Sequence, residues 1–171
     1  MENQSNKFTV TAKALAQQME SKMNPQENAM VGKVYSAAMK LAFSTHTHFK
    51  VMDEIDAELK KHGINNASSV LGSETSHIMQ IVYSQAKGLP PAALIPSGIL
   101  FLAKLCEFYS KSLSMPMNDK VFSDAAHMLI TLLRSKYEPD FHNKIGMPAQ
   151  ASQPDQQAAP QTPGMLSTGG A

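Results

Sequence analysis

The chain has little of several residue types that mark whole classes of protein. Cys106 is its only cysteine, so it has neither an internal disulfide nor a CxxC pair for metal or redox chemistry. Arg134 is its only arginine, and the 15 Lys and Arg residues are balanced by 14 Asp and Glu residues. Nucleic-acid-binding surfaces need an excess of positive charge to hold phosphates. The composition therefore argues against sequence-specific nucleic-acid binding and predicts a protein partner.

Neither a secretory signal nor an exposed thiol is indicated. Residues 1–30 contain no apolar run after a basic start, which a secretory signal requires. Cys106 lies in an apolar stretch, and free cysteines in such surroundings are mostly small buried hydrophobic residues. We therefore expect synthesis in a reducing cytoplasm.

No motif for catalysis or cofactor binding occurs in the chain. Gly-rich phosphate loops, HExxH and GxSxG are all absent. His46 and His48 in "THTH" point about 200° apart on a helix, so they cannot bind one metal ion together. Asp124 and His127 follow Ser123 along one helix, whereas a nucleophilic triad needs residues that converge in a cleft. The sequence predicts no catalytic, cofactor-binding or metal-binding residue, and no enzyme activity.

Apolar residues recur at intervals of three and four along the chain, which predicts an all-α fold. We expect a compact bundle of about five helices. Asn24, Pro25 and Glu27 form a capping signature at the start of the second helix, and Gly63 is placed to end that helix. The predicted helices span residues 8–22, 25–62, 68–87, 97–112 and 118–137.

The most apolar stretch, residues 89–109, belongs either to a membrane span or to a protein core. A span needs about 20 apolar residues, and the stretch approaches that length. Three prolines interrupt its first third, and Lys104 and Glu107 place charge in the rest. We expect Pro91 to start a single turn and Ser97 to cap a central core helix. A membrane or oligomer contact through this stretch is the alternative.

The composition changes abruptly at Met147. Residues 147–171 contain four Pro, five Gln, three Gly and a single charged residue, Asp155. Such a segment cannot bury enough apolar surface to offset its conformational entropy, so we expect a disordered tail. The chain then divides into a short N-terminal helix or arm at 1–24, a helical domain at 25–146 and this tail.

Four apolar residues are candidates for contacts with a partner. Met115 and Met117 flank a proline in the "SMPMND" loop, and flexible thioethers suit a surface that repacks against a partner. Met165 and Leu166 form an isolated apolar pair in "PGMLSTGGA", which is a candidate docking peptide. The alternative for the tail is that two apolar residues occur there by chance.

Three features follow one another along the chain: a helical domain, the segment "GLPPAALIPSGILFLAKLCEF" with its proline motif "LIPSGI", and a Gln/Pro/Ala tail ending in "PGMLSTGGA". In this order they resemble small accessory virion proteins of tailed bacteriophages. The resemblance covers roughly residues 28–171 and carries over no functional residue. It implies a structural component bound at the portal or tail, or an internal protein ejected with the genome.

The resemblance implies a virion protein that is made in the host cytoplasm, binds other virion proteins and forms a homo-oligomer or ring. A rigid helical body and a flexible peptide would suit many copies around a symmetric complex. The alternative is a cytoplasmic helical adaptor or chaperone whose groove holds a partner helix. A membrane-active ejection protein is a third hypothesis, and it requires residues 89–109 to leave the core.

Overall fold

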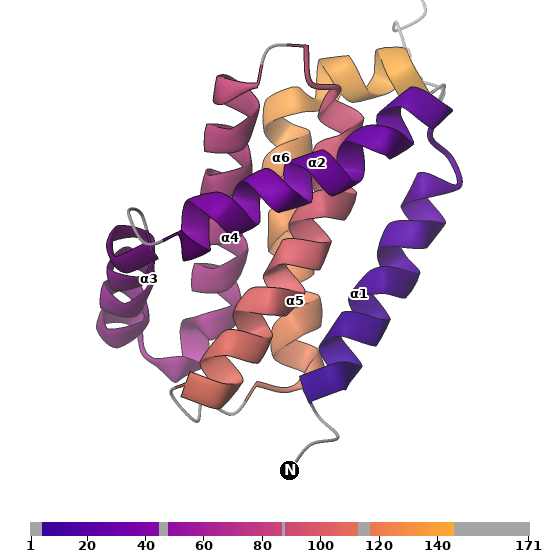
Figure 1. Ribbon diagram of the computed structural model, residues 1–171. Helices are drawn as coiled ribbons and strands as arrows, with labels where there is room; N and C mark the ends of the chain where they lie inside the picture. Colours follow the sequence, from indigo (N-terminus) through magenta and orange to yellow (C-terminus); the bar gives the residue numbers. More distant parts are fainter. Residues whose placement is uncertain (1–4, 45–47, 87, 113–116, 146–171) are drawn as a thin grey trace, which may run out of the picture.

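The computed structural model describes residues 5–44, 48–86, 88–112 and 117–145. Within these ranges the chain is all-α, as predicted, and has no strand. The described residues form six α-helices, where about five were expected, and two short 3-10 helices (Figure 1). The α-helices are α1 (Ser5–Glu20), α2 (Pro25–Phe43), α3 (His48–His62), α4 (Ala67–Gln85), α5 (Leu94–Ser112) and α6 (Asp119–Ile145), and the 3-10 helices are η1 (Ile64–Asn66) and η2 (Pro91–Ala93).

Helix α5 is the centre of the bundle, and α1, α2, α4 and α6 all pack on it. Figure 1 shows α2 crossing in front of α5, with α1 on one side of the molecule and α3 on the other. Helices α4 and α6 pack closely on each other, while α3 packs on α2 and α4. Helices α1 and α2 both rest on α5 but, among the described residues, make few contacts with each other. Part of α5 therefore lies between them without a covering helix.

The start of α2 has the cap that the sequence predicts. The Asn24 side chain accepts a hydrogen bond from the Glu27 backbone N–H at 2.9 Å, and the Glu27 carboxylate accepts one from the Asn24 N–H at 3.2 Å. Pro25 occupies the first turn, where a missing N–H costs nothing. This capping box gives partners to two backbone donors that the helix itself cannot satisfy.

The prediction of one long helix over residues 25–62 is wrong, because α2 and α3 are separate helices. Ser44, which follows the last residue of α2, is extended, with φ −77° and ψ 150°, and its N–H bonds to the Lys40 carbonyl. The sequence at this point is "STHT". Serine and threonine are in general poor helix formers, because their hydroxyls can bond to the backbone in non-helical conformations and threonine is β-branched. Apolar spacing resumes after the break, which is why the pattern suggested a single helix.

Gly63 ends α3, as predicted. Its φ of 75° lies in the left-handed region that glycine adopts without steric penalty, and its N–H bonds to the Leu59 carbonyl at 2.9 Å. Helix η1 follows directly, and α4 begins at Ala67, close to the expected start at residue 68. Helix α6 extends to Ile145, well beyond its expected end at residue 137.

Residues 89–109 lie mainly in the protein core. Pro91–Ala93 forms the predicted single turn, and every residue from Pro91 to Ile99 is buried. By length and composition, Pro91–Ser112 is the one helix in the described ranges that could cross a membrane, and its most apolar 18-residue window has a mean hydropathy of 1.5. However, 78% of its most apolar window is buried inside the protein, which is the environment of a core helix.

Ser97 is not the helix cap that the sequence suggested. Helix α5 begins at Leu94, and Ser97 lies inside it with no exposed surface. The Ser97 Oγ lies 2.6 Å from the Ala93 carbonyl oxygen and 2.9 Å from the Val31 carbonyl oxygen of α2. Serine within a helix commonly bonds to the carbonyl four residues back. Here the same hydroxyl also faces a second helix, which explains why a polar residue is buried at this point.

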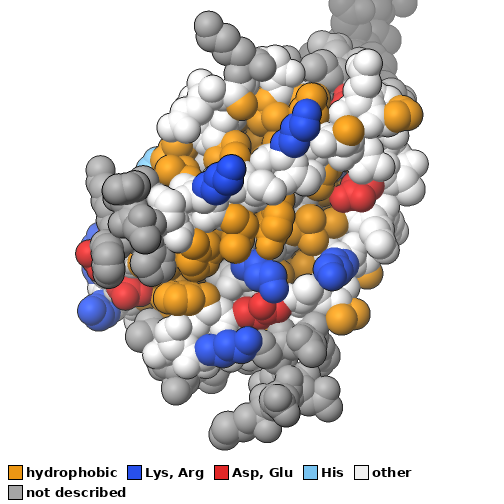
Figure 2. All heavy atoms as spheres, viewed as in Figure 1, with side chains coloured by type: hydrophobic (Ala, Val, Ile, Leu, Met, Phe, Trp, Pro, Cys, Tyr) orange, Lys and Arg blue, Asp and Glu red, His pale blue; other side chains and the backbone are white. Residues whose placement is uncertain are grey.

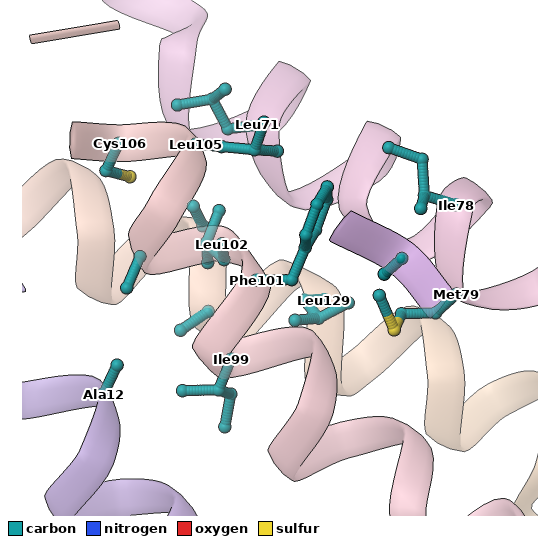
Figure 3. Packing of buried hydrophobic residues seen from close by; sticks show 14 of the residues in the cluster. Ala12, Leu71, Ile78, Met79, Ile99, Phe101, Leu102, Leu105, Cys106 and Leu129 are labelled. Carbon is teal, nitrogen blue, oxygen red and sulfur yellow. The ribbon is translucent and has the colours of Figure 1, made fainter. Parts of the chain in front are cut away.

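The core is continuous from the first helix to the last. Figure 3 shows Leu102 of α5 between Leu71 of α4 and Leu129 of α6, and all three side chains are fully buried. On the other side of α5, Ile99 faces Ala12 of α1. Since Ala12 belongs to the same core cluster, α1 packs as part of the bundle.

Candidate partner-binding surface

The structure describes one of the four residues predicted to contact a partner. Met115, Met165 and Leu166 lie outside the described residues, so their contacts stay predictions. Met117 is 5% exposed and belongs to the core cluster, so the expectation that it is exposed is wrong. It lies immediately before α6, and burying its apolar thioether there is favourable. A place next to a proline in a loop did not make this side chain available to a partner.

The polar motifs of the sequence remain separate on the helices that carry them. Asp124 pairs with Lys120 at 2.5 Å, and His127 is exposed on the same helix. On α3, His62 lies 3.0 Å from Glu58. In the ranges that the structure describes, no three His, Cys, Asp or Glu residues are grouped so that they could hold a metal ion.

Cys106 is fully buried in α5, as expected. Burial, and to a smaller extent the charge of Glu107, raises the pKa of its thiol to about 12. Because the thiolate is the reactive form, this cysteine is inert at neutral pH.

Buried polar groups lie on α3, α4 and α5, and among them Tyr109 of α5 is close to Asp56 of α3. The Tyr109 hydroxyl lies 3.6 Å from the Met52 Sδ, and burial together with the nearby Asp56 carboxylate raises the pKa of Tyr109. One carboxylate oxygen of Asp56 and the hydroxyl of Thr75 are buried without a hydrogen-bond partner among the described residues. Tyr109 and Thr75 have no exposed surface, so a substrate would not reach them in this structure. These groups lie between helices rather than in an open site.

Helix α5 exposes mainly one face, and the residues on it recur at intervals of three and four. Leu100, Lys104, Glu107 and Phe108 are partly exposed, and Lys111 is exposed. Residues with this spacing lie one above another along a helix. From Leu100 to Lys111 the face is about 16 Å long, at 1.5 Å rise per residue. It combines apolar side chains with two lysines and one carboxylate.

Helix α2 adds an apolar edge to this face. The rings of Phe43 and Phe108 are 5.8 Å apart between centroids and meet edge to face. Tyr35 and Met39 precede Phe43 at intervals of four residues, and all three are partly buried against the core. We define the α2–α5 strip as Tyr35, Met39, Phe43, Leu100, Lys104, Glu107, Phe108 and Lys111.

Helix α1 forms the other edge, and the strip's carboxylate joins it to α5. The Thr9 hydroxyl donates to one oxygen of Glu107, and the Lys104 ammonium donates to the other at 2.8 Å. Burial alone would raise the pKa of Glu107, but these hydrogen bonds and the charge of Lys104 hold it below its ordinary value. Glu107 is therefore ionised at neutral pH, and its charge is balanced by Lys104. Lys13 is exposed one turn beyond Thr9 on α1.

Lysines surround the strip on several sides. Figure 2 shows orange apolar side chains gathered on this face of the molecule, with blue lysine side chains among and around them. Lys13 and Lys111 form no ion pair with any described side chain, whereas the strip's one carboxylate is already paired. Lys33 and Lys40 are exposed on the outer face of α2, where small side chains line a shallow, open depression. The strip is thus an apolar surface with a net positive rim.

The sequence contained a signal for the charged part of this surface only. Lys104, Glu107 and Lys111 recur with helical spacing in an otherwise apolar helix, which indicates the side that faces water. Leu100 and Phe108 carry no such signal, because their partial exposure depends on where α1 and α2 pack. The apolar half of the strip was visible only in the folded structure.

No protein-family model matches the chain, and comparisons with curated proteins and with solved structures gave no match. Function is therefore inferred from the residues and surface of this chain.

Proposed function

We propose that this chain is a non-enzymatic component of a protein assembly and that it binds its partners through its helical surface. The α2–α5 strip carries the proposal, because its apolar side chains are partly exposed and Lys13 and Lys111 have no ion-pair partner among the described residues. Accessible apolar surface next to charged side chains is typical of contacts between proteins. Among the described residues, by contrast, no three His, Cys, Asp or Glu side chains are grouped as in a metal site, and Cys106 and Tyr109 are closed to solvent, which favours binding over catalysis.

The first form of this proposal is a structural protein of a tailed-bacteriophage particle, bound at the portal or tail or within the internal ejection assembly. It draws on the pattern resemblance over residues 28–171. A rigid helical body suits a component that is repeated around a symmetric complex as a homo-oligomer or ring. The tail at 147–171, through Met165 and Leu166, would supply a second contact to a neighbouring subunit.

Sedimentation of a lysate through a dense cushion tests this form of the proposal. The lysate would come from the source organism or its infected host, and mass spectrometry would quantify the chain in the pellet. The proposal predicts that the chain pellets with large particles at a fixed molar ratio to their other proteins. Recovery only in the soluble fraction, as an isolated monomer, would contradict both the virion role and any role in an assembly.

A cytoplasmic helical adaptor or chaperone is the second candidate. The arrangement of α1 and α2 favours it. Both pack on α5 but make few contacts with each other among the described residues, and the face of α5 between them is partly exposed to a partner helix. An adaptor would stay in the soluble fraction of the same experiment, in a complex with one smaller partner. That outcome would replace the virion role and keep the helical surface as the binding element.

A further inference from the structure

The exposed residues of the α2–α5 strip are spaced so that one helix of a partner could pack along them. Its residues on α5, from Leu100 to Lys111, repeat at intervals of four, three and four and extend about 16 Å, which is the length of three helical turns. Helices pack by placing ridges with this spacing into the grooves of a neighbour. Helix α2 limits the strip on one side and α1 on the other, so an occupant would lie along α5 between them.

The charges of the strip determine the sign of the charges that a partner segment must carry. Glu107 forms its ion pair with Lys104, and the charge of Lys111 also helps to lower the pKa of Glu107. One carboxylate therefore faces three lysines, and Lys13 and Lys111 leave the strip with a net positive charge. Lys13 lies on α1 one turn from Thr9, whose hydroxyl bonds to Glu107. Its ammonium therefore lies beside the strip, across from the α2 edge. A binding segment with carboxylates on both flanks of an apolar ridge would meet both lysines, whereas a basic segment would be repelled.

We propose that the α2–α5 strip binds an acidic amphipathic helical segment of a partner protein. Its apolar ridge contacts Phe43, Leu100 and Phe108, and its carboxylates pair with Lys13 and Lys111. This inference rests on the proposed role as a protein-binding component, and it adds the chemical class of the partner. The neutralised pair Lys104 and Glu107 lies in the middle of the contact, where an unpaired charge would be costly to bury.

Two other occupants fit the residues less well. An anionic membrane would need apolar side chains that protrude, but Phe43 and Phe108 are half-buried and pack on each other. A second copy of this chain could offer the exposed carboxylates Asp53 and Glu54 of α3. These lie beside Lys60 and Lys61 on a helix whose apolar side chains, such as Ile55, are already used in the core. Helix α3 therefore lacks a free apolar ridge to place on the strip.

Two synthetic peptides test the inference with the full-length chain. Both are helical and share the same leucine ridge, but one carries glutamates and the other lysines on its flanks. Fluorescence anisotropy of the labelled peptides should show binding of the glutamate peptide, and at least about tenfold weaker binding of the lysine peptide. No binding of the glutamate peptide up to millimolar concentration, or equal binding of both peptides, would overturn the inference.

Charge reversal locates the contact. The double variant Lys13→Glu/Lys111→Glu should weaken binding of the glutamate peptide by at least about tenfold. The matched control, Lys60→Glu/Arg134→Glu, makes the same change in net charge on exposed residues of α3 and α6 and should change affinity less than about twofold. Circular dichroism should show both variants folded. An equal loss in the control would mean that net charge, not the strip, attracts the peptide.

Two parallel measurements separate the remaining occupants. Any binding of the chain to vesicles of phosphatidylserine and phosphatidylcholine should be unaffected by the Lys13→Glu/Lys111→Glu substitutions. Binding that these substitutions abolish would mean that the strip is a membrane-binding surface. Analytical ultracentrifugation should show no self-association through the strip. Self-association that the Lys13→Glu/Lys111→Glu variant abolishes would mean that the occupant is a second copy of the chain. Either result overturns the inference, while pelleting at a fixed ratio with particles would still support the proposed function.

Discussion

The Ser97 Oγ and the Val31 carbonyl oxygen lie 2.9 Å apart in the buried centre of the bundle, where they connect α5 to α2. The hydroxyl has one proton, and the Ala93 carbonyl oxygen is also within reach at 2.6 Å. A single side chain thus gives the most apolar helix of the chain a polar contact with the helix that crosses it. The contact holds in place the two elements that form the α2–α5 strip.

Ser97→Ala should lower the free energy of unfolding by about 1 kcal/mol, because it removes one buried hydrogen bond without leaving a large cavity. Urea denaturation followed by circular dichroism measures the change. A variant as stable as the wild type would show that the hydroxyl contributes nothing to the contact between α5 and α2.

Gly72→Ala should destabilise the contact between α4 and α6. A Cβ at this position would lie 2.6 Å from the Ala125 carbonyl oxygen and 2.8 Å from the Met128 Cβ, so the two helices would have to move apart. Overpacking of this kind costs about 1 to 3 kcal/mol. Gly32→Ala is the matched control, because nothing lies within 4 Å of its Cβ position, and it should stabilise α2 by up to about 1 kcal/mol. Thermal unfolding of both variants should show shifts of opposite sign.

Leu102 and Leu100 should respond differently to the same substitution. Leu102 has no exposed surface, so Leu102→Asp buries a carboxylate and should cost at least about 3 kcal/mol or prevent folding. Leu100 is partly exposed on the strip, so Leu100→Asp should cost roughly 1 kcal/mol and leave the chain folded. Circular dichroism and denaturation of the purified variants measure both effects. Similar costs would mean that the two faces of α5 are equally buried in solution.

Glu107→Gln should reduce stability at neutral pH but not in acid. The hydrogen bonds from Lys104 and Thr9 overcome the effect of burial and lower the pKa of Glu107 in the folded state. A carboxyl with a lowered folded pKa stabilises the fold above its unfolded pKa, about 4.3, and loses this contribution as the pH falls through the folded pKa. The difference in unfolding free energy between wild type and variant should therefore shrink from about pH 7 to about pH 3.

Glu74 has the opposite pH dependence, because burial raises its pKa, but it is present in both proteins and cancels in the difference. A difference between wild type and Glu107→Gln that stays constant over this pH range would contradict the role of the Glu107 carboxylate.

Features that depend on neighbours in sequence were predictable. The capping box at Asn24 and the stop at Gly63 use contacts within one turn, and η2 follows from Pro91 in the same way. The break after Phe43 was not predicted, because apolar spacing resumes beyond it. The burial of Ser97 was not predicted either, because it depends on the way α2 crosses α5.

The candidate surface was harder to predict than the fold. Met117 was expected to be exposed because of its place in a loop, yet its side chain fills the core. The helix that carries Leu100 and Phe108 was expected to be a central core helix, yet these two side chains remain partly exposed on the strip. In each case exposure depends on how distant helices pack, and a local pattern carries no information about that packing.

Lysine reactivity in the assembled state shows whether partners bind at the α2–α5 strip. The rates of acetylation of Lys13 and Lys111 would be compared with those of Lys60 and Lys22, in the free chain and in the complex recovered from a lysate, by mass spectrometry. If partners bind at the strip, Lys13 and Lys111 should be modified more slowly in the complex, and the modification of Lys60 and Lys22 should be unchanged. Unchanged rates at Lys13 and Lys111, or protection of the control lysines instead, would show that partners bind elsewhere on the molecule.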